Sequence, residues 1–383
     1  MAAYLDNSAT TAVCAAARDK AIVMMSDNFG NPSSLHTMGI RAEREMTAAR
    51  RAVCAFFGLD DNGADLSCVT FTSGGTEANN LAIFGAAAAK KRQGHHVVTT
   101  AIEHPSVLEA MKQLEREGFE LTIVTPDEHG DISAQALASA CRPDTILVSA
   151  MLVNNELGTL LPIREAVPLI RAAAPQALIH CDAVQAAGKL PLKVRALDVD
   201  MMSISGHKLH APKGVGALYV KRGVRIVPRL FGGGQEKGLR SGTESVPLIA
   251  AFGEAIKAVR PFPAQMSRYE SLTARLTDGL QAFDNVVIHK PQKSVPYILH
   301  LSACGFKSET LVHFLAERDV FVSAGSACAK GHDSHVLKAI GLPDREIGSS
   351  LRISLCADNT PEDIDAFLAA LRDAVASLAS VKR

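Results

Sequence analysis

The sequence predicts a large α/β domain with a mostly parallel sheet, followed by a smaller α+β domain. Up to Arg260, short apolar segments alternate with segments of helical spacing, a pattern typical of a parallel sheet. After that point Pro-Phe-Pro at 261–263 interrupts the chain, and longer helices alternate with fewer strands. We therefore place the large domain at 13–260, and the small domain at 1–12 together with 261–383.

Each predicted element follows from hydrophobic spacing and from start or stop signals. Strands are predicted in the short apolar runs HVVTTAIEH, LTIVTP, TILVSAMLV, ALIHCDAV, MMSIS and VGALYV. Helical spacing predicts helices at 38–58, 76–92, 105–117, 133–141, 163–174, 264–283, 308–318 and 361–379. The helix at 76–92 ends in AKKRQG, where basic residues and a glycine form a typical helix stop.

Composition and charge indicate an ordinary globular chain. Of its 383 residues 47% are hydrophobic and 21% charged, and 40 Lys and Arg balance 40 Asp and Glu. Zero net charge argues against nucleic acid or an acidic membrane as the main partner. The N-terminus resembles no signal peptide, and the stretch LAIFGAAAA is too short to span a bilayer. We therefore expect a cytoplasmic protein. Its eight cysteines form no C-x-x-C pair, so we expect neither a disulfide framework nor a metal site.

The stretch FTSGGTEANN at 71–80 is the first of four features that follow predicted strands. In it two glycines turn the chain, and Thr76 opens a helix. Ligands of open α/β sheets gather at the carboxyl ends of strands, and free N–H groups at a helix N-terminus attract phosphate. The alternative is a tight turn with an ordinary helix cap. The glycine spacing matches neither a P-loop nor a dinucleotide-binding motif.

The other three features are polar groups after predicted strands: Asp182 and Gln185 in IHCDAVQAAG, His104 in AIEHPSV, and Lys208 in SISGHKLHAPKG. Taken singly, the aspartate could cap a turn and the histidine could be a hydrogen-bonded structural residue. A buried lysine, in contrast, needs a partner. Together, a phosphate site, an acid, an aromatic ring and a desolvated lysine are the parts needed to hold pyridoxal 5'-phosphate.

In that interpretation Lys208 is bonded rather than paired. Its amine forms a Schiff base with the aldehyde of the cofactor, and burial favours the neutral, nucleophilic amine. Asp182 keeps a proton on the pyridine nitrogen, so that the ring can accept electrons. The imidazole of His104 stacks on the ring face.

A series of ordered motifs extends this interpretation over almost the whole chain: LDNSATT, GNPSSLH, FTSGGTEANN, EHPSV, VNNELGT, CDAVQAAGKLP, SGHKLHAPKGVGALYV, RSGTES and SAGSAC. In these motifs the sequence resembles cysteine desulfurases of the nitrogen-fixation and iron–sulfur-cluster type, which are fold-type I pyridoxal-phosphate-dependent transferases. The resemblance runs from about Tyr4 to beyond Arg352. It implies that L-cysteine is converted to L-alanine, with sulfur left on an enzyme cysteine as a persulfide.

The resemblance also implies roles for individual residues. Lys208 and His104 would be catalytic, Asp182 would pair with the pyridinium, and Arg352 would clamp the substrate carboxylate with its bidentate fork. Thr243 in RSGTES would reach the phosphate of the neighbouring subunit, which implies a homodimer. The remaining contacts are implied for Gly75, Thr76, Ser205 and His207 at the phosphate, and for Gln185 and Asn155 at the ring oxygen and the substrate side.

Cys328 is the residue predicted to receive the sulfur. It lies in VSAGSACAKGHDS, a run of small residues that predicts an accessible loop, and Lys330 and His332 could favour its thiolate. Taken alone it could be an inert loop thiol, but the SAGSAC motif favours a nucleophile. The run AKGHDS is about two residues shorter than in relatives of this family, counted up to the helix start at VLKAIGL. A zinc cluster of Cys328, His332 and His335 is not favoured, because structural zinc needs a fourth ligand.

Other cysteines, such as Cys54, Cys68 and Cys181, lie in or beside apolar segments and are predicted to be core residues. A selenocysteine lyase or a related transaminase would use the same lysine, acid and phosphate site, but a transaminase needs no loop cysteine. A non-catalytic protein of this fold would be expected to lack the lysine, the acid or the arginine, and none is missing. The predicted function is therefore cysteine desulfurase, with a sulfur-acceptor or scaffold protein as a further partner.

Overall fold

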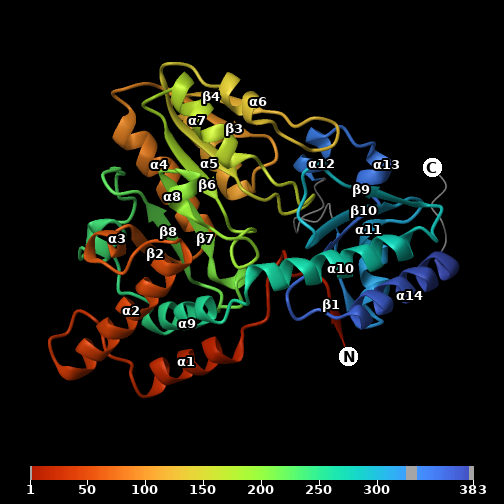
Figure 1. Ribbon diagram of the computed structural model, residues 1–383, viewed down its shortest axis with the longest axis horizontal. Helices are drawn as coiled ribbons and strands as arrows, with labels where there is room; N and C mark the ends of the chain where they lie inside the picture. Colours follow the sequence, from red (N-terminus) through yellow and green to blue (C-terminus); the bar gives the residue numbers. More distant parts are fainter. Residues whose placement is uncertain (1, 325–333, 379–383) are drawn as a thin grey trace.

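The computed structural model describes residues 2–324 and 334–378, and these residues form two main β-sheets with helices around them (Figure 1). The predicted roles of Cys328, Lys330 and His332 lie outside the described residues.

The larger sheet has seven strands, and six of them run parallel. Their spatial order is β2 (Val69–Thr72), β8 (Gly216–Val220), β7 (Met201–Ser205), β6 (Leu178–Asp182), β5 (Thr145–Met151), β3 (His96–Thr100) and β4 (Glu120–Val124). Only β8 is antiparallel to its neighbours, because the connection from β7, residues 206–215, is too short for the crossover that a parallel strand requires. The predicted mostly parallel α/β sheet is confirmed.

Helices cover both faces of this sheet, because neighbouring residues of a strand point to opposite faces. Leu147 and Leu178 pack in one apolar cluster with α4 (Gly75–Lys90) and α5 (Pro105–Arg116). Val148 and Ile179 pack in the other cluster, with helices of the opposite face. Those helices are α2 (Thr37–Phe56), α6 (Ala134–Ser139), α7 (Ile163–Ala173) and α9 (Val246–Lys257), and α1 (Ala15–Ser26) packs on α9. The sequence analysis did not anticipate α1 and α9.

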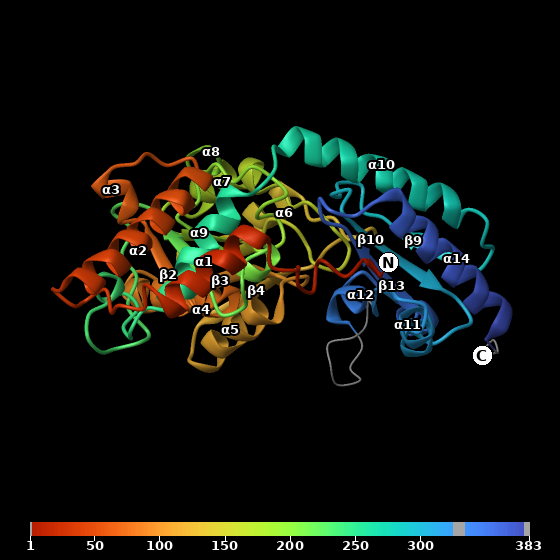
Figure 2. The ribbon, with the colours of Figure 1, turned by 90° about the horizontal axis from the view of Figure 1, so that it is seen from below.

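The smaller sheet is antiparallel and has the order β12 (Ser323–Ala324), β13 (Ser350–Ser354), β10 (Ile298–Ala303) and β9 (Val286–His289). Around it lie α10 (Phe262–Leu280), α11 (Ser308–Ala316), α12 (His335–Ala339), α13 (Asp344–Ile347) and α14 (Pro361–Ser377). The N-terminal strand β1 (Ala3–Tyr4) pairs with β11 (Val320–Phe321), and Figure 2 shows the N-terminus beside this sheet. The chain start therefore lies with the C-terminal third, and the exact domain boundaries stay a prediction.

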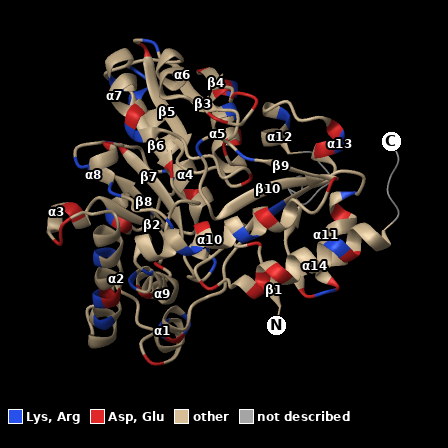
Figure 3. Ribbon diagram, turned by 45° about the vertical axis from the view of Figure 1, so that its right-hand side comes forward, with Lys and Arg blue, Asp and Glu red and all other residues tan. Residues whose placement is uncertain are grey.

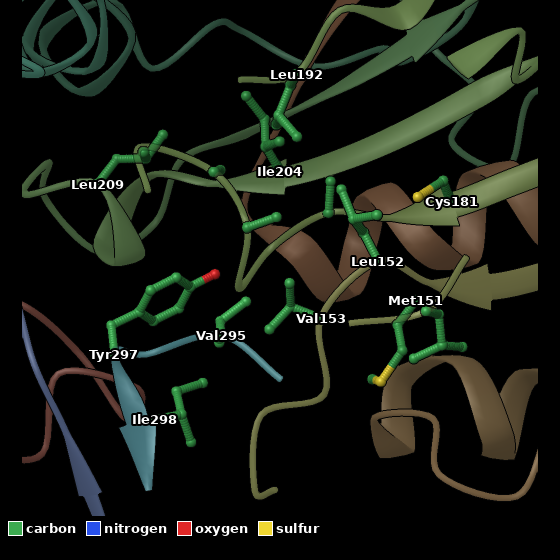
Figure 4. Packing of buried hydrophobic residues seen from close by; sticks show 14 of the residues in the cluster. Met151, Leu152, Val153, Cys181, Leu192, Ile204, Leu209, Val295, Tyr297 and Ile298 are labelled. Carbon is green, nitrogen blue, oxygen red and sulfur yellow. The ribbon is translucent and has the colours of Figure 1, made fainter. Parts of the chain in front are cut away.

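The two sheets share one continuous apolar core. Figure 4 shows Val153, Ile204 and Leu209 of the larger half close to Tyr297 and Ile298 of the smaller half, and all five belong to one cluster of buried residues. The Tyr297 hydroxyl donates a hydrogen bond of 3.1 Å to the backbone oxygen of Gln185, which ties the two halves together. This packing fixes how the strand ends of one sheet face the other sheet.

The surface carries both signs of charge. Figure 3 shows Lys and Arg interspersed with Asp and Glu along the visible helices. Among the described residues, no helix is long and apolar enough to cross a membrane.

Candidate active site

A cavity of about 400 Å³ lies between the strand ends of the larger sheet and the smaller sheet. Its walls come from the N-terminal segment, from the ends of β6 and β7, from the start of α4, and from β12 and β13. It brings together ten of the predicted site residues: Gly75, Thr76, His104, Asn155, Asp182, Gln185, Ser205, His207, Lys208 and Arg352. Thr243 is exposed and does not line it, and Cys328 lies outside the described residues.

One end of the cavity is suited to an anion. The chain turns at Gly74, whose φ of 154° favours glycine, and α4 begins at Gly75, one residue before the predicted start. A Cβ atom on Gly75 would lie 2.9 Å from Val184 Cγ2 and 3.4 Å from Ser205 Cβ. Only glycine therefore fits here, and the helix presents its unpaired N–H groups to the cavity wall. These features support the phosphate interpretation over that of an ordinary helix cap.

Asp182 ends β6 with its carboxylate held by two neutral donors. Its Oδ2 accepts a hydrogen bond of 2.7 Å from Asn79 Nδ2, and its Oδ1 accepts one of 2.9 Å from the backbone N–H of Val184. Asn79, which the sequence analysis missed, lies one helical turn after Gly75. This i,i+4 spacing from the phosphate end of α4 is the signal that could have identified it.

Gln185 and Lys208 both contact the N-terminal segment. Gln185 Nε2 donates to the backbone oxygen of Ser8 at 2.9 Å, whereas its buried Oε1 has no partner among the described residues. Lys208 lies on a short 3-10 turn (Gly206–Lys208) after β7, and its Nζ donates to the backbone oxygens of Ser8 and of Ala9, the latter at 2.7 Å. The LDNSATT motif thus supplies acceptors whose roles the sequence analysis did not assign.

The Lys208 amine loses much of its charge at neutral pH. The pKa of Lys208 is lowered to about 7, mainly by burial and also by the positive charges of Arg352 and Lys189, against smaller opposing effects of Asp6 and Asp182. Backbone carbonyls, which are neutral, are its hydrogen-bond partners. A substantial neutral fraction is therefore present near pH 7, as a nucleophile or a base requires.

His104 is the N-cap of α5 and is oriented by Ser106. The backbone N–H of Ser106 donates to His104 Nδ1 at 3.1 Å, and Ser106 Oγ lies 2.8 Å from the same nitrogen. Since Nδ1 accepts, the neutral ring carries its proton on Nε2. Desolvation lowers the pKa of His104, partly offset by Asp182. The ring is thus neutral at neutral pH and can lie against a flat ligand.

Arg352 on β13 reaches the cavity from the smaller sheet. Its Nη1 donates to the backbone oxygen of Asn155 at 3.0 Å, and its Nη2 forms an ion pair of 2.7 Å with Asp6. Its Nε is buried without a partner among the described residues. The guanidinium is therefore held at the cavity wall with donor capacity left for a ligand carboxylate.

Comparison with known proteins places this geometry in a family. The family model described as aminotransferase class-V matches residues 3–367. The chain belongs to this family. It is 41% identical over 384 residues to cysteine desulfurase IscS of Serratia proteamaculans, covering 98% of this chain and 93% of the relative. A solved NifS-like protein superposes with a TM-score of 0.92 at 36% identity, covering 99% of this chain and 100% of the other. The structure of SspA in complex with cysteine superposes with a TM-score of 0.80 at 34% identity, covering 92% of this chain and 98% of the other. The predicted resemblance is confirmed.

The cofactor of this aminotransferase class-V chain is pyridoxal 5'-phosphate, and the cavity residues fit it. The start of α4 would hold the phosphate with its unpaired N–H groups, beside Gly75, where a Cβ atom would lie 2.9 Å from Val184 Cγ2. Lys208 offers a partly neutral amine, Asp182 an oriented carboxylate, and Gln185 Oε1 a buried acceptor without a partner among the described residues.

Two cavity residues that the sequence analysis gave no catalytic role lie near the substrate side. Glu156, in the NNELGT motif, accepts a hydrogen bond from Ser334 Oγ, and burial raises the pKa of Glu156. His335 at the start of α12 donates through Nε2 to the backbone oxygen of Glu103 at 2.9 Å. Long-range packing brings Glu156 and His335 to the cavity. The sequence offered a signal for Glu156 alone, through the NNELGT motif that contains it.

Proposed function

We propose that this chain is a cysteine desulfurase, which converts L-cysteine to L-alanine and leaves the sulfur on Cys328 as a persulfide. The observation that carries the proposal is one cavity of about 400 Å³ in which a desolvated lysine, an oriented aspartate and an arginine meet. Lys208 and Asp182 suit the cofactor, and Arg352 suits the carboxylate of an amino acid.

The protein's own groups divide the work at the cofactor. Bound pyridoxal phosphate supplies an electron-withdrawing ring that weakens the bonds at the substrate α-carbon. Asp182, oriented by Asn79, holds a proton at the pyridine nitrogen. Lys208, whose pKa is about 7, accepts the α-proton as a neutral amine. His104 would cover the ring face, held in orientation by Ser106.

Arg352 positions the substrate. Its fork binds the α-carboxylate, while Asn155 keeps the guanidinium in place through its backbone oxygen. Asp6 shares the same guanidinium, so it competes with the incoming carboxylate.

Cys328 receives the sulfur in a balanced exchange. The carbon–sulfur bond of cysteine breaks, a sulfur–sulfur bond forms to Cys328 Sγ, and a proton replaces sulfur on the carbon, so no external oxidant or reductant is needed. Ala324 and His335, the described residues near each end of the segment that contains Cys328, both line the cavity. In contrast, Cys54, Cys68 and Cys181 are buried as predicted, and burial raises the pKa of each of these thiols.

The proposal includes a homodimer in which Thr243 of one subunit reaches the phosphate site of the other. Supporting it, four large apolar side chains are more than half exposed: Met25 in α1, Phe29 and Leu35 between α1 and α2, and Phe231 between β8 and α9. Exposed apolar patches mark interaction sites.

The proposal also includes a sulfur-acceptor or scaffold protein, which would use the sulfur for iron–sulfur clusters or other sulfur-requiring biosynthesis. It further includes a cytoplasmic location, where thiols stay reduced.

One experiment tests the reaction and the sulfur carrier together. The purified holoenzyme is mixed with L-cysteine, alanine and sulfide are quantified, and peptides are analysed by mass spectrometry after one turnover. We expect alanine in step with cysteine loss and one added sulfur on the Cys328 peptide. Cys328→Ala should bind cofactor but release essentially no alanine, while Cys304→Ala serves as the matched control. Added sulfur on another cysteine, or pyruvate in place of alanine, would contradict the proposal.

A further inference from the structure

A second cavity, of about 160 Å³, borders Lys208 but shares no other residue with the catalytic cavity. Its walls come from the segment after Lys208, from the connection between β13 and α14, and from α10. Three of its residues carry side chains that bind transition metals: His210, Cys356 and Asp358. One ligand atom from each lies within 4.8 Å of the other two.

His210 is oriented as a metal ligand would be. Its Nδ1 lies 3.0 Å from the backbone oxygen of Ala12, which can only accept, so Nδ1 carries the proton. Nε2 is then the nitrogen with a free lone pair, and no described residue hydrogen-bonds to it. Metal-binding histidines typically donate their other N–H to a carbonyl in this way. The backbone of His210 also has φ of 60°, a left-handed conformation uncommon outside glycine.

Cys356 and Asp358 supply the two anionic groups from one short connection. Cys356 is buried, and burial raises the pKa of its thiol, against smaller opposing effects of the backbone N–H groups of Asp358 and Asn359. A bound ion therefore has to displace the thiol proton, as metal binding by cysteine requires. Asp358 is exposed and forms an ion pair of 2.5 Å with Arg260. The site thus runs from a buried thiol to a solvent-exposed carboxylate, which provides an entry path for an ion.

We propose that His210, Cys356 and Asp358 bind a divalent ion of the zinc type, with water as the fourth ligand. Nitrogen, sulfur and oxygen ligands are the set that zinc accepts. At zinc bond lengths of roughly 2.0–2.3 Å, tetrahedral ligands lie about 3.5 Å apart. The exposed Asp358 side chain can close the remaining gap by leaving Arg260.

Two cations limit the affinity of this site. Arg260 competes for Asp358, and the buried Lys189 lines the same cavity. We therefore expect binding weaker than at structural zinc sites, whose ligands face no such competitors. A bound ion links the segment after Lys208 to the end of β13, so it should raise the thermal midpoint of the holoenzyme.

The test is calorimetric titration of the cofactor-loaded protein with zinc chloride. It is run on the unaltered chain and again in a Cys328→Ala background, which removes the predicted reactive thiol. We expect one zinc ion bound per chain, both in the unaltered protein and in the Cys328→Ala background. Cys356→Ser and His210→Gln should each weaken binding at least about tenfold, a loss at the low end of that seen even for outer-shell partners of metal ligands. Cys14→Ser, which alters another cysteine of the same cavity, should bind as the unaltered chain does.

A second variant tests the site in the opposite direction. Arg260→Ala frees Asp358 and should tighten zinc binding several-fold, and Co²⁺ bound in place of zinc should show a near-ultraviolet sulfur-to-cobalt charge-transfer band that Cys356→Ser lacks. Equal zinc affinity in Cys356→Ser and the unaltered chain would overturn the proposal. If that variant does not fold, unchanged or weaker zinc binding by Arg260→Ala overturns it instead.

Discussion

The two walls of the catalytic cavity differ in how they hold their charged groups. On the larger-sheet wall, Asp182 and Lys208 follow directly from the ends of β6 and β7 and are fixed by neutral donors or acceptors. On the smaller-sheet wall, Arg352 lies inside β13 and is paired with a charged group, Asp6. Neutral contacts leave a lysine free to change its protonation, whereas an ion pair holds the Arg352 guanidinium in place. The first wall is therefore suited to chemistry and the second to binding.

Lys208→Ala should have the largest effect, because it removes the partly neutral amine that the larger-sheet wall presents to the cofactor. We expect kcat to fall by at least about a thousandfold, at the upper range for a general base. The visible absorbance of the bound cofactor should also change, since its amine partner is gone. The exposed Lys193→Ala is the control. Sulfide production at the normal rate would remove Lys208 from the mechanism.

Asp182→Asn keeps the size of the side chain but removes its charge. We expect kcat to fall about a hundredfold, the cost of losing one preorganised electrostatic contact. Asn79→Ala, which removes an orienting donor but leaves the charge, should have a smaller effect. Steady-state kinetics with equal cofactor loading distinguishes the two, and full activity of Asp182→Asn would mean that another acid serves the ring nitrogen.

The same contrast explains what could be predicted from the sequence. Lys208, Asp182 and the glycine turn before α4 each follow a strand within a few residues, so local pattern places them. Asp6 and Arg352 are 346 residues apart, and long-range backbone pairing, of β1 with β11 and of Leu5 and Asn7 with Ser354, brings the N-terminal segment to the cavity. Local pattern also missed α1 and α9, which pack against each other.

Arg352→Lys should act on binding rather than on chemistry. The charge remains, but the bidentate fork is lost, so we expect KM for cysteine to rise about tenfold to a hundredfold with a smaller change in kcat. Cofactor absorbance should stay normal, in contrast to Lys208→Ala. An unchanged KM would show that the smaller-sheet wall does not hold the carboxylate.

Asp6→Asn should have the smallest effect, and it should act on residues of both walls, Arg352 and Lys208. Asp6 occupies one side of the Arg352 guanidinium, so its removal should lower KM by a few-fold at most, the scale of a partly exposed ion pair. Asp6 also opposes the lowering of the Lys208 pKa, which is about 7 with Asp6 in place. Without that carboxylate the pKa of Lys208 falls further, and the neutral base persists to lower pH. The acid limb of the kcat profile should therefore move to lower pH in Asp6→Asn, while a shift to higher pH would show that Lys208 is not the group that titrates there.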